Sequence, residues 1–239
     1  PDPAFVSGDL GRKTISFTQA NSYPDVRLKI YYPATSPTKI GCSNDNFAIR
    51  PNTFANFAVT DTDWATAGTG RALNDVTFGT VIHKAGRPLR GRATALNAAG
   101  TPAVTTNYAG TPTATFTACV GAACTATFGT MGSLPFVAGQ LVSDVASYDN
   151  VGSFALQLVD STFANVDAAD TAGDCTAAGR YVCSATINVG RFVPDHFAVA
   201  LNTPVFGTAC GSFTYIGQAF NYVTAPVITV TAQGFANNT

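Results

Sequence analysis

The side chains best suited to acid–base chemistry lie in one stretch, Gly190–Val199, where Asp195 and His196 are adjacent. The only other histidine, His83, is remote in the sequence. A catalytic histidine needs a nucleophile and an orienting acid beside it, yet adjacent residues of a strand point to opposite faces. The sequence also has no GxSxG nucleophile elbow. We therefore interpret both histidines as structural or exposed residues, and we predict that the protein is not an enzyme.

Calcium binding is a second chemistry that the sequence suggests, through an aspartate-bearing loop between Asp160 and Asp174. Calcium takes about six to eight oxygen ligands, and the spacing of these aspartates matches no EF-hand or β-roll repeat. A solvated loop is the favoured interpretation, so we predict no metal and no cofactor. The weak calcium candidates are Asp160, Asp167, Asp170 and Asp174, with Asp61 and Asp63 weaker still.

Sugar binding would need exposed aromatic side chains, or two carboxylates at a fixed separation across a cleft. Lone aromatic residues near strands are more often part of a core, and the sequence cannot show a carboxylate pair. A carbohydrate-binding module is therefore the third of three functional hypotheses, with glycans as a possible partner. The candidates for an aromatic platform are Tyr23, Tyr31, Tyr32 and Trp64.

The six cysteines indicate disulfides rather than a metal site. Two pairs are close in sequence, and neither has the CxxC spacing of a zinc site. We expect each close pair to form a local disulfide at the end of a hairpin, which implies an oxidising compartment. The other two cysteines are expected to pair with each other or with cysteines outside these residues. The close pairs are Cys119–Cys124 and Cys175–Cys183, and the remaining residues are Cys42 and Cys210.

The composition is typical of an exported β-protein. Only 11% of the 239 residues are charged, less than half the usual fraction of about 25%, and Thr-rich strands still fit a pleated sheet. The formal net charge is −1, and without a basic stripe we expect no nucleic-acid partner. No apolar run reaches the roughly 18 residues of a membrane helix, so no membrane insertion is expected in this segment. The first residues lack a signal-peptide pattern, which predicts a processed start or an excerpt.

Short runs of alternating residues predict strands along the whole chain. Val26–Tyr32, for example, alternates with a period of two and predicts one half-buried strand. No window has the three-to-four-residue apolar period of a helix. Many short strands and frequent Gly, Pro and Asn turns predict an all-β fold of tandem Ig-like, Greek-key β-sandwich modules with little or no helix. The predicted strands are Thr14–Phe17, Val26–Tyr32, Phe47–Arg50, Phe57–Thr60, Val76–Ile82, Leu89–Leu96, Thr105–Tyr108, Ala114–Ala118, Thr125–Phe128, Leu141–Ala146, Gly152–Asp160 and Tyr181–Val189.

Internal repeats suggest how these strands are grouped. The strongest pairs Asp45-Asn-Phe-Ala-Ile with Asp195-His-Phe-Ala-Val, 150 residues later. Histidine is not kept in the earlier copy, where Asn46 stands in place of His196, so the repeat favours a joint between modules over an active site. Three weaker repeats pair Ser22–Val26 with Ser147–Val151, Ala85–Leu89 with Ile216–Phe220, and Arg92–Leu96 with Thr229–Gln233.

Three modules account for these repeats. Residues 1–40 are predicted to be the C-terminal part of a preceding β-module, and residues 45–190 a complete Ig-like sandwich. Residues 191–239 are predicted to be the N-terminal part of a further module, truncated or completed by another chain. The predicted joint residues are Asp45, Phe47, Pro51, Pro194, Asp195 and Phe197, with the phenylalanines as core anchors and the prolines as stiffeners.

Four motifs carry a resemblance to a known family: GRFVPDHFAV, CSNDNFAIRP, FTYIGQAF and the spaced pattern from Ala85 to Tyr108. From about Ser22 onward, the chain resembles the large surface proteins related to the MSHA biogenesis protein MshQ. The resemblance implies export, Ig-like β-modules and a link to type IV pili or adhesion, and it supplies no catalytic residues. Such proteins are long and often carry a lectin-like domain elsewhere, so binding specificity is expected outside this segment.

The leading expectation is a structural cell-surface protein, the stalk of an adhesin or a pilus-associated component. The alternative is a self-assembling extracellular filament subunit, completed by β-strand addition between subunits. Expected partners are other copies of the chain or pilus and surface components. The expected location is the cell surface or the extracellular space, reached through an oxidising compartment.

Overall fold

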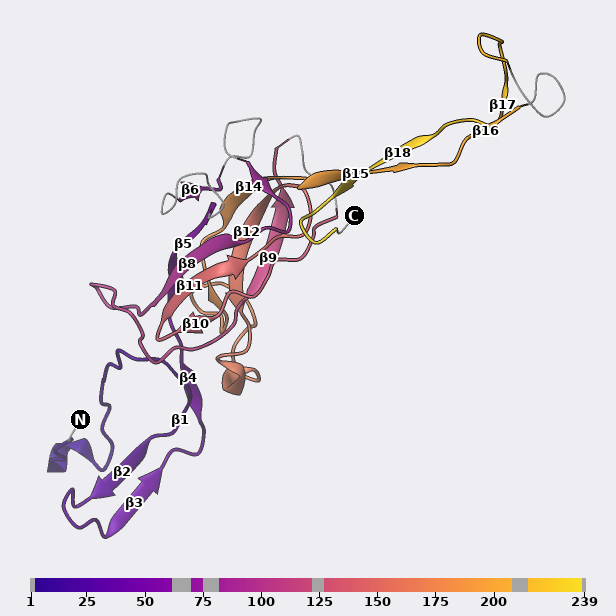
Figure 1. Ribbon diagram of the computed structural model, residues 1–239. Helices are drawn as coiled ribbons and strands as arrows, with labels where there is room; N and C mark the ends of the chain where they lie inside the picture. The colour runs from indigo at the N-terminus through magenta and orange to yellow at the C-terminus, as the bar shows by residue number, and fades with distance from the viewer. Residues whose placement is uncertain (1–2, 62–69, 75–81, 122–126, 208–214, 238–239) are drawn as a thin grey trace.

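A computed structural model describes residues 3–61, 70–74, 82–121, 127–207 and 215–237. Within these ranges the chain is all-β, as predicted, and contains no α-helix. Two short 3-10 helices, η1 (Ser7–Asp9) and η2 (Asn165–Asp167), interrupt the strands. The molecule is elongated: a central body carries one arm at each of its two opposite ends (Figure 1). We call residues 3–50 the N-terminal arm, residues 51–193 the body and residues 194–237 the C-terminal arm.

The body is a sandwich of two sheets. The first sheet has the strand order β10-β11-β8-β5-β6, and every pairing in it is antiparallel. Burial alternates along β8, as the sequence predicts for a strand with one face on a core. The strands are β10 (Phe136–Val137), β11 (Gln140–Ala146), β8 (Leu89–Leu96), β5 (Thr53–Asp61) and β6 (Arg71–Ala72).

The second sheet of the body has the order β13-β12-β14-β7, and β9 also pairs with β12. Its pairings are antiparallel except for the last, in which β7 lies parallel to β14. The central strand β12 is buried on both faces over most of its length, which explains its run of apolar residues. The strands are β13 (Val182–Cys183), β12 (Gly152–Asp160), β14 (Ile187–Val193), β7 (His83–Lys84) and β9 (Thr113–Cys119).

Aromatic residues from both sheets fill the space between them. Phe54 of the first sheet packs on Tyr108 and Phe136, with ring centroids 5.4 and 4.6 Å away. At the other end of the core, Phe154 and Phe192 of the second sheet stack at 5.7 Å. The Tyr108 hydroxyl donates to Asp160 Oδ2 over 2.7 Å, so this buried polar group is satisfied. One continuous apolar core therefore lies inside the body.

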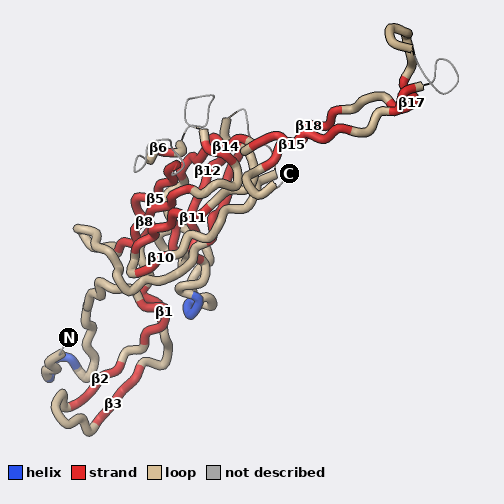
Figure 2. The backbone as a smooth tube through the Cα atoms, in the orientation of Figure 1, coloured by secondary structure: helices blue, strands red, loops and turns tan. Residues whose placement is uncertain are grey.

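The two arms are thin β-ribbons with little core of their own (Figures 1 and 2). In the N-terminal arm, β1 (Tyr23–Val26) pairs with β4 (Phe47–Ile49), and β2 (Lys29–Tyr32) pairs with β3 (Lys39–Cys42). In the C-terminal arm, β15 (His196–Leu201) pairs with β18 (Ile228–Gln233), and β16 (Val205–Phe206) pairs with β17 (Tyr222–Thr224). Each of these sheets has two strands among the described residues.

Several predicted strands differ from the observed ones. Val26–Tyr32 is divided between β1 and β2, and β2 is exposed on both faces because no described segment packs over it as a second layer. Thr105–Tyr108 forms a turn, closed by a hydrogen bond from the Tyr108 N–H to the Thr105 carbonyl, and Thr14–Phe17 is not a strand. Tyr181–Val189 is divided between β13 and β14. Most of Val76–Ile82 and part of Thr125–Phe128 lie outside the described residues.

Candidate functional site: the two joints of the body

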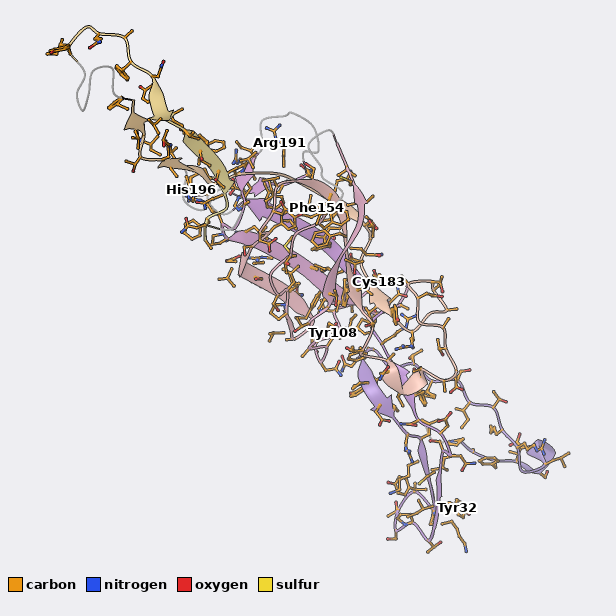
Figure 3. All side chains as sticks on the ribbon, turned by 90° about the vertical axis from the view of Figure 1, so that its right-hand side faces the viewer. Tyr32, Tyr108, Phe154, Cys183, Arg191 and His196 are labelled. Atoms are coloured by element: carbon orange, nitrogen blue, oxygen red, sulfur yellow. A yellow bond between two sulfur atoms is a disulfide. The ribbon has the colours of Figure 1, made fainter. Side chains whose placement is uncertain are left out.

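The C-terminal joint connects the last strand of the body to the C-terminal arm, and Asp195 lies at its centre. The Asp195 carboxylate is 2.5 Å from Arg87 Nε and 3.7 Å from Lys84 Nζ, both on a turn of the body. Its other oxygen is 3.1 Å from His196 Nδ1. The Asp195 side chain is only 10% exposed. Figure 3 shows His196 at the base of the arm, next to the body.

The turn that receives the arm runs from Lys84 to Arg87, and we call it the seat turn. Gly86 adopts φ +80°, a left-handed conformation that glycine reaches without strain. The Gly86 N–H donates to the Tyr148 carbonyl over 2.7 Å, which ties the turn to the body. The Phe235 N–H, just after β18, donates to the Ala85 carbonyl over 2.9 Å. The Arg87 guanidinium lies 5.1 Å from the centre of the Phe235 ring. Both strands at the base of the arm are therefore held by one turn.

Electrostatics at this joint favour the ionised form of Asp195. The hydrogen bond from Arg87 is the largest cause and lowers the pKa of the Asp195 carboxyl below its ordinary value, and the His196 contact adds to the effect. Partial burial works in the opposite direction but is weaker. The joint is thus held by a charge-assisted contact that acid would remove.

Beneath the seat turn, His83 belongs to a buried polar cluster. Its Nδ1 lies 3.0 Å from Asp61 Oδ1, and its Nε2 lies 3.2 Å from the Arg87 carbonyl oxygen. Arg71 also donates to the Asp61 carboxylate. Both ring nitrogens of His83 therefore face oxygen atoms. The interpretation of His83 as a structural residue fits this geometry, since the histidine ties β5 to the seat turn.

The N-terminal joint, between the N-terminal arm and the body, uses hydrogen bonds in which one partner is a backbone group. The Ser22 N–H donates to Asn107 Oδ1 over 3.0 Å, and Asn107 Nδ2 donates back to the Ser22 carbonyl. Ser22 is buried, with 1% of its surface exposed. On β4, the Ala48 N–H donates to the Asp167 carboxylate over 3.1 Å. These contacts join both strands of the β1–β4 pair to loops of the body.

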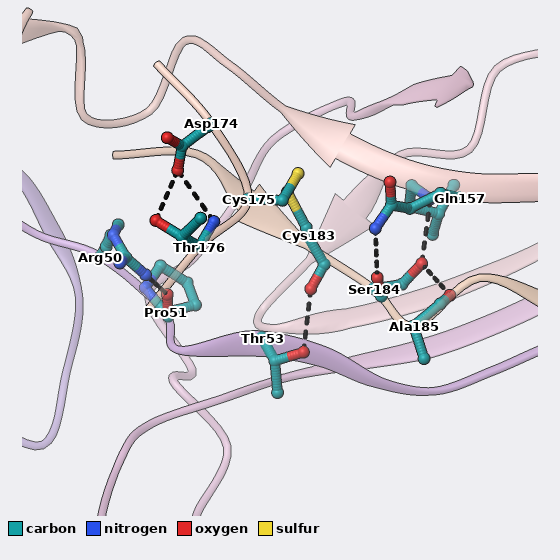
Figure 4. Close-up of a disulfide and its surroundings, with 11 residues drawn as sticks. Arg50, Pro51, Thr53, Gln157, Asp174, Cys175, Thr176, Cys183, Ser184 and Ala185 are labelled. Atoms are coloured by element: carbon teal, nitrogen blue, oxygen red, sulfur yellow. Dashed lines mark hydrogen bonds between the residues drawn. A yellow bond between two sulfur atoms is a disulfide. The ribbon is translucent and has the colours of Figure 1, made fainter. Parts of the chain in front are cut away.

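The connection from β12 to β13, which carries Asp167, also carries Cys175, and this cysteine forms a disulfide with Cys183 of β13 (Figure 4). This loop also reaches the N-terminal joint through Arg50, whose Nη2 donates to the Ala177 carbonyl over 3.0 Å. At the start of β5, the Thr53 hydroxyl donates to the Cys183 carbonyl over 2.8 Å. The disulfide-closed loop therefore touches the chain on both sides of Pro51, where the arm enters the body.

The cysteines follow the prediction in part. Cys175 and Cys183 form the expected local disulfide, and Cys119 is also disulfide-bonded. Cys124 and Cys210 lie outside the described residues. The expected pairing of Cys42 is not observed, because its thiol is free and exposed on the N-terminal arm. Disulfides of this kind persist in oxidising compartments.

Pro51 lies where the N-terminal arm enters the body, and Pro194, Asp195 and Phe197 lie at the C-terminal joint, whereas Asp45 and Phe47 lie within the N-terminal arm. The role predicted for the phenylalanines needs correction. Phe47 is half-buried and Phe197 is 64% exposed, so Phe197 is not a core anchor in this structure. The physical reason is that, within the part of the chain that the structure describes, no second sheet covers the β15–β18 ribbon. Pro51 is buried at the entry to β5, and Pro194 is half-buried beside Asp195.

The four weak calcium candidates do not converge on one point. Asp160 accepts from the Tyr108 hydroxyl and from the Thr162 and Phe163 N–H groups. Asp174 accepts from Thr176, whose hydrogen bonds lower the pKa of the Asp174 carboxyl. Asp167 binds β4, as described above, and Asp170 is exposed. Among the described residues, no three acidic, histidine or cysteine side chains form a group that could hold a metal ion.

The aromatic residues of the N-terminal arm are exposed rather than part of a core. Tyr32, at the far end of the arm, is 73% exposed, and Tyr31 is 47% exposed. A shallow groove of about 660 Å³ lies nearby. Apolar side chains, Ile15, Phe17, Leu28 and Ile30 among them, line much of it. Trp64 lies outside the described residues. The sequence did not indicate this exposure, because the exposure arises from the two-stranded form of the arm, in which no described segment packs over the strands.

Sequence reasoning missed several residues that build the joints. Arg87 and Phe235 hold the C-terminal joint, and Asn107 holds the N-terminal one. The one available signal was the repeat of Ala85–Leu89 at Ile216–Phe220, which marks the seat turn. Nothing in the sequence around Asn107 indicated its partner 85 residues away.

The fold and its joints define a class, namely an all-β protein in which a sandwich body is joined to exposed ribbons at both ends. Comparison with known families gives one match, to part of the chain. Residues 150–239 match the family described as DUF6701, third domain. The matched range starts just before β12 and runs through the C-terminal joint into the C-terminal arm. No curated protein and no solved structure matches the chain. Within the described residues, no helix has the length and apolarity that crossing a membrane takes.

Proposed function

We propose that the protein is a non-catalytic stalk component of a cell-surface adhesin or pilus-associated assembly. The observation that carries the proposal is the arrangement of the body between two ribbons that leave its opposite ends, each held by a joint made of named contacts (Figures 1 and 3). A stalk needs modules that keep their direction relative to one another. The ion pair of the C-terminal joint and the braced loop of the N-terminal joint both restrict rotation there.

Three further points support the proposal. The match to a third domain of a family suits a long parent protein with several domains. The resemblance of the joint motifs to MshQ-related surface proteins suits a place beside type IV pili. The Cys175–Cys183 disulfide and the low fraction of charged residues, 11%, suit export through an oxidising compartment.

A second function, a filament subunit, is favoured by one specific observation. The C-terminal arm exposes large apolar residues on a two-stranded ribbon, and residues 197–239 contain no charged side chain. Natural proteins usually protect such strand edges with charges or with a covering layer. This uncharged ribbon is suited to pairing with another strand, from its own polypeptide in a stalk or from a neighbouring subunit in a filament.

Two measurements test the stalk proposal. Solution scattering of the purified chain should give an elongated particle with the maximum dimension of the structure, whereas a compact particle would contradict it. On intact cells that produce the parent protein, a membrane-impermeant amine reagent should label the lysines of this chain. A cytoplasmic protein in the same cells serves as the control. Labelling of both proteins only after lysis would refute the cell-surface location.

A further inference from the structure

The C-terminal arm begins as a regular two-stranded ribbon, β15 paired with β18. The register is unbroken along the pair, from His196 opposite Gln233 to Leu201 opposite Ile228. Residues directly opposite each other in an antiparallel pair place their side chains on the same face of the ribbon, and successive residues of a strand alternate between the two faces. The register therefore assigns every side chain of the two strands to one of two faces.

The two faces of this ribbon differ in composition. One face consists of six apolar residues, and we call it the apolar face. The opposite face carries small or polar residues and is half-buried near the body. The apolar face comprises Phe197, Val199, Leu201, Ile228, Val230 and Ala232, and the opposite face comprises His196, Ala198, Ala200, Thr229, Thr231 and Gln233. Such a division is typical of strands that place one face on a core.

The apolar face nevertheless lies in solvent. Its five large side chains are between 57% and 72% exposed. Five side chains of this kind present on the order of 500 Å² of surface. Monomeric soluble proteins rarely expose a contiguous apolar patch of more than a few hundred Å², and larger patches mark surfaces that bind another molecule. The apolar face therefore has the properties of an interaction surface.

The absence of charge on the apolar face favours a second copy of the chain as its partner. Residues 197–239 contain no Asp, Glu, Lys or Arg. In a two-fold contact each surface meets its own image, so a charged side chain would lie near the same charge of the other copy. The groove of the N-terminal arm would suffer this repulsion, because Lys13 and Lys29 line it. The apolar face avoids it.

The size of the apolar face also suits a contact between two copies. Burying the face on both copies would remove on the order of 1,000 Å² in total, which is the lower limit for a specific protein–protein interface. Val199 and Val230 are cross-strand partners in the middle of the face, so a two-fold axis near them would bury the whole face of each copy. An interface of this size predicts a reversible dimer in the micromolar range.

We propose that two copies of the chain pack their apolar faces together around a two-fold axis that passes close to Val199 and Val230. The four strands then form a small sandwich, in which each ribbon supplies the second layer for the other. The contact uses the faces of the ribbons and not their strand edges, so it differs from β-strand addition. An isologous contact closes at two copies, so it joins two stalk components without producing a filament. This inference goes beyond the stalk function and does not depend on it.

Sedimentation of the full chain across the micromolar range tests the proposal. Every chain carries Cys42→Ser, so that the free thiol on the N-terminal arm cannot link two copies. We expect a reversible equilibrium between monomer and dimer. Val199→Asp places a charge in the middle of the apolar face and should weaken dimerisation about a hundredfold. Ala200→Asp, on the opposite face of the same strand, should change the dissociation constant by no more than about twofold.

The Ala200→Asp chain is a matched control, because position 200 is exposed like position 199 and neither aspartate enters the core of the body. A second matched pair on β18 is Val230→Asp with Thr229→Asp, and the same difference is expected. Mixing Val199→Asp chains with Val199→Lys chains should give mixed dimers at least about tenfold tighter than either variant forms alone, because opposite charges then meet near the axis.

Three results would overturn the proposal. The chain could remain monomeric throughout the micromolar range. Val199→Asp and Ala200→Asp could weaken a dimer equally, which would assign the contact to another surface. The chain could also bind phosphatidylcholine vesicles through the apolar face without dimerising, which would make a lipid surface the partner. Each result would leave the stalk function standing, since surface labelling and the scattering of the dilute monomer do not depend on contacts between copies.

Discussion

Each joint attaches an arm to the body, but the two joints use different contacts. At the C-terminal joint, Asp195 binds Arg87 and Lys84 through its charge. At the N-terminal joint, Asn107 binds the backbone of Ser22, and Asp167 accepts from a backbone N–H of β4. The first joint is centred on an ion pair, whereas the second is made of hydrogen bonds to backbone groups and lies beside a loop that a disulfide closes. The two copies of the repeated sequence Asp-x-Phe-Ala are therefore held by different contacts.

The comparison also shows what the aspartate of the repeat is for. Asp195 is 10% exposed and surrounded by basic groups, whereas Asp45 is exposed and binds its own neighbour. The two residues occupy equivalent positions of the repeat, and among the described residues only Asp195 has a turn such as the seat turn beside it. The aspartate is therefore buried and ion-paired at the one position where such a turn receives it.

The largest expected effect comes from removing the Cys175–Cys183 disulfide beside the N-terminal joint. Cys175→Ser with Cys183→Ser opens a loop with a sequence separation of 8 and should lower the free energy of unfolding by about 2.5 kcal/mol. Urea titration measures the loss, and hydrogen exchange should show the Ala48 amide exchanging faster. The Phe235 amide at the other joint is the internal control. Equal acceleration at both amides would mean that the joints are not independent.

The seat turn should be sensitive to a single methyl group. A Cβ added at Gly86 would meet the Phe235 backbone nitrogen at 3.0 Å, in a left-handed conformation. Gly86→Ala should therefore cost about 2 kcal/mol and release the base of the arm. Gly217→Ala is the matched control, because it has the same φ but no atom within 4 Å of the added Cβ. Losses of the same size in the two variants would show that backbone strain alone is responsible.

The ion pair of the C-terminal joint should contribute less to the free energy of unfolding than the disulfide or Gly86 does. A double-mutant cycle of Arg87→Ala and Asp195→Ala should give a coupling of about 1 kcal/mol that weakens with added salt. Arg90→Ala with Asp144→Ala provides the comparison, because the same chemistry there lies on the exposed face of the first sheet. The cycle is measured by urea unfolding at low and high salt. A coupling at Arg87 no greater than at Arg90 would contradict a special role for the joint.

The smallest of the expected effects is the loosening of the C-terminal joint by acid. The pKa of Asp195 is lowered in the folded chain, chiefly by Arg87, so its contribution is complete above the unfolded value, about 3.9. That contribution is lost as the pH falls through the folded pKa. Exchange at the Phe235 amide should increase only below about pH 4, and Asp195→Asn should remove this dependence. An increase that begins near neutral pH would assign the effect to a histidine instead.

The body was largely predictable from the sequence, and the arms were not. Strands β8 and β12 coincide with their predicted bounds because each has a regular apolar pattern and turn residues at its ends. Val26–Tyr32 has an equally regular pattern, yet it is divided between two strands and is exposed. Periodicity indicates which face of a strand could be buried, but it does not indicate whether another layer covers that face. Phe197 was misjudged for the same reason.

The candidate site was predictable in outline only. The Asp45 and Asp195 repeat marked the residues that follow β3 and β14, and a weaker repeat covered Ala85–Leu89 without indicating its role. The partners Arg87, Phe235 and Asn107 could not be found, because each contact joins residues far apart in sequence. His83 and Asp61, 22 residues apart, meet only because the fold places the end of β5 in the first sheet beside β7, the last strand of the second sheet.

The central claim is that the joint holds the C-terminal arm in a fixed direction from the body. The most direct test is a pulsed electron resonance measurement between spin labels at Val142 on β11 and Val223 on β17, both exposed. Attachment through an introduced ketone side chain leaves the cysteines untouched. We predict a single narrow distance distribution that broadens in Gly86→Ala. A broad distribution in the unaltered chain, unchanged by Gly86→Ala, would contradict a stiff joint and with it the stalk.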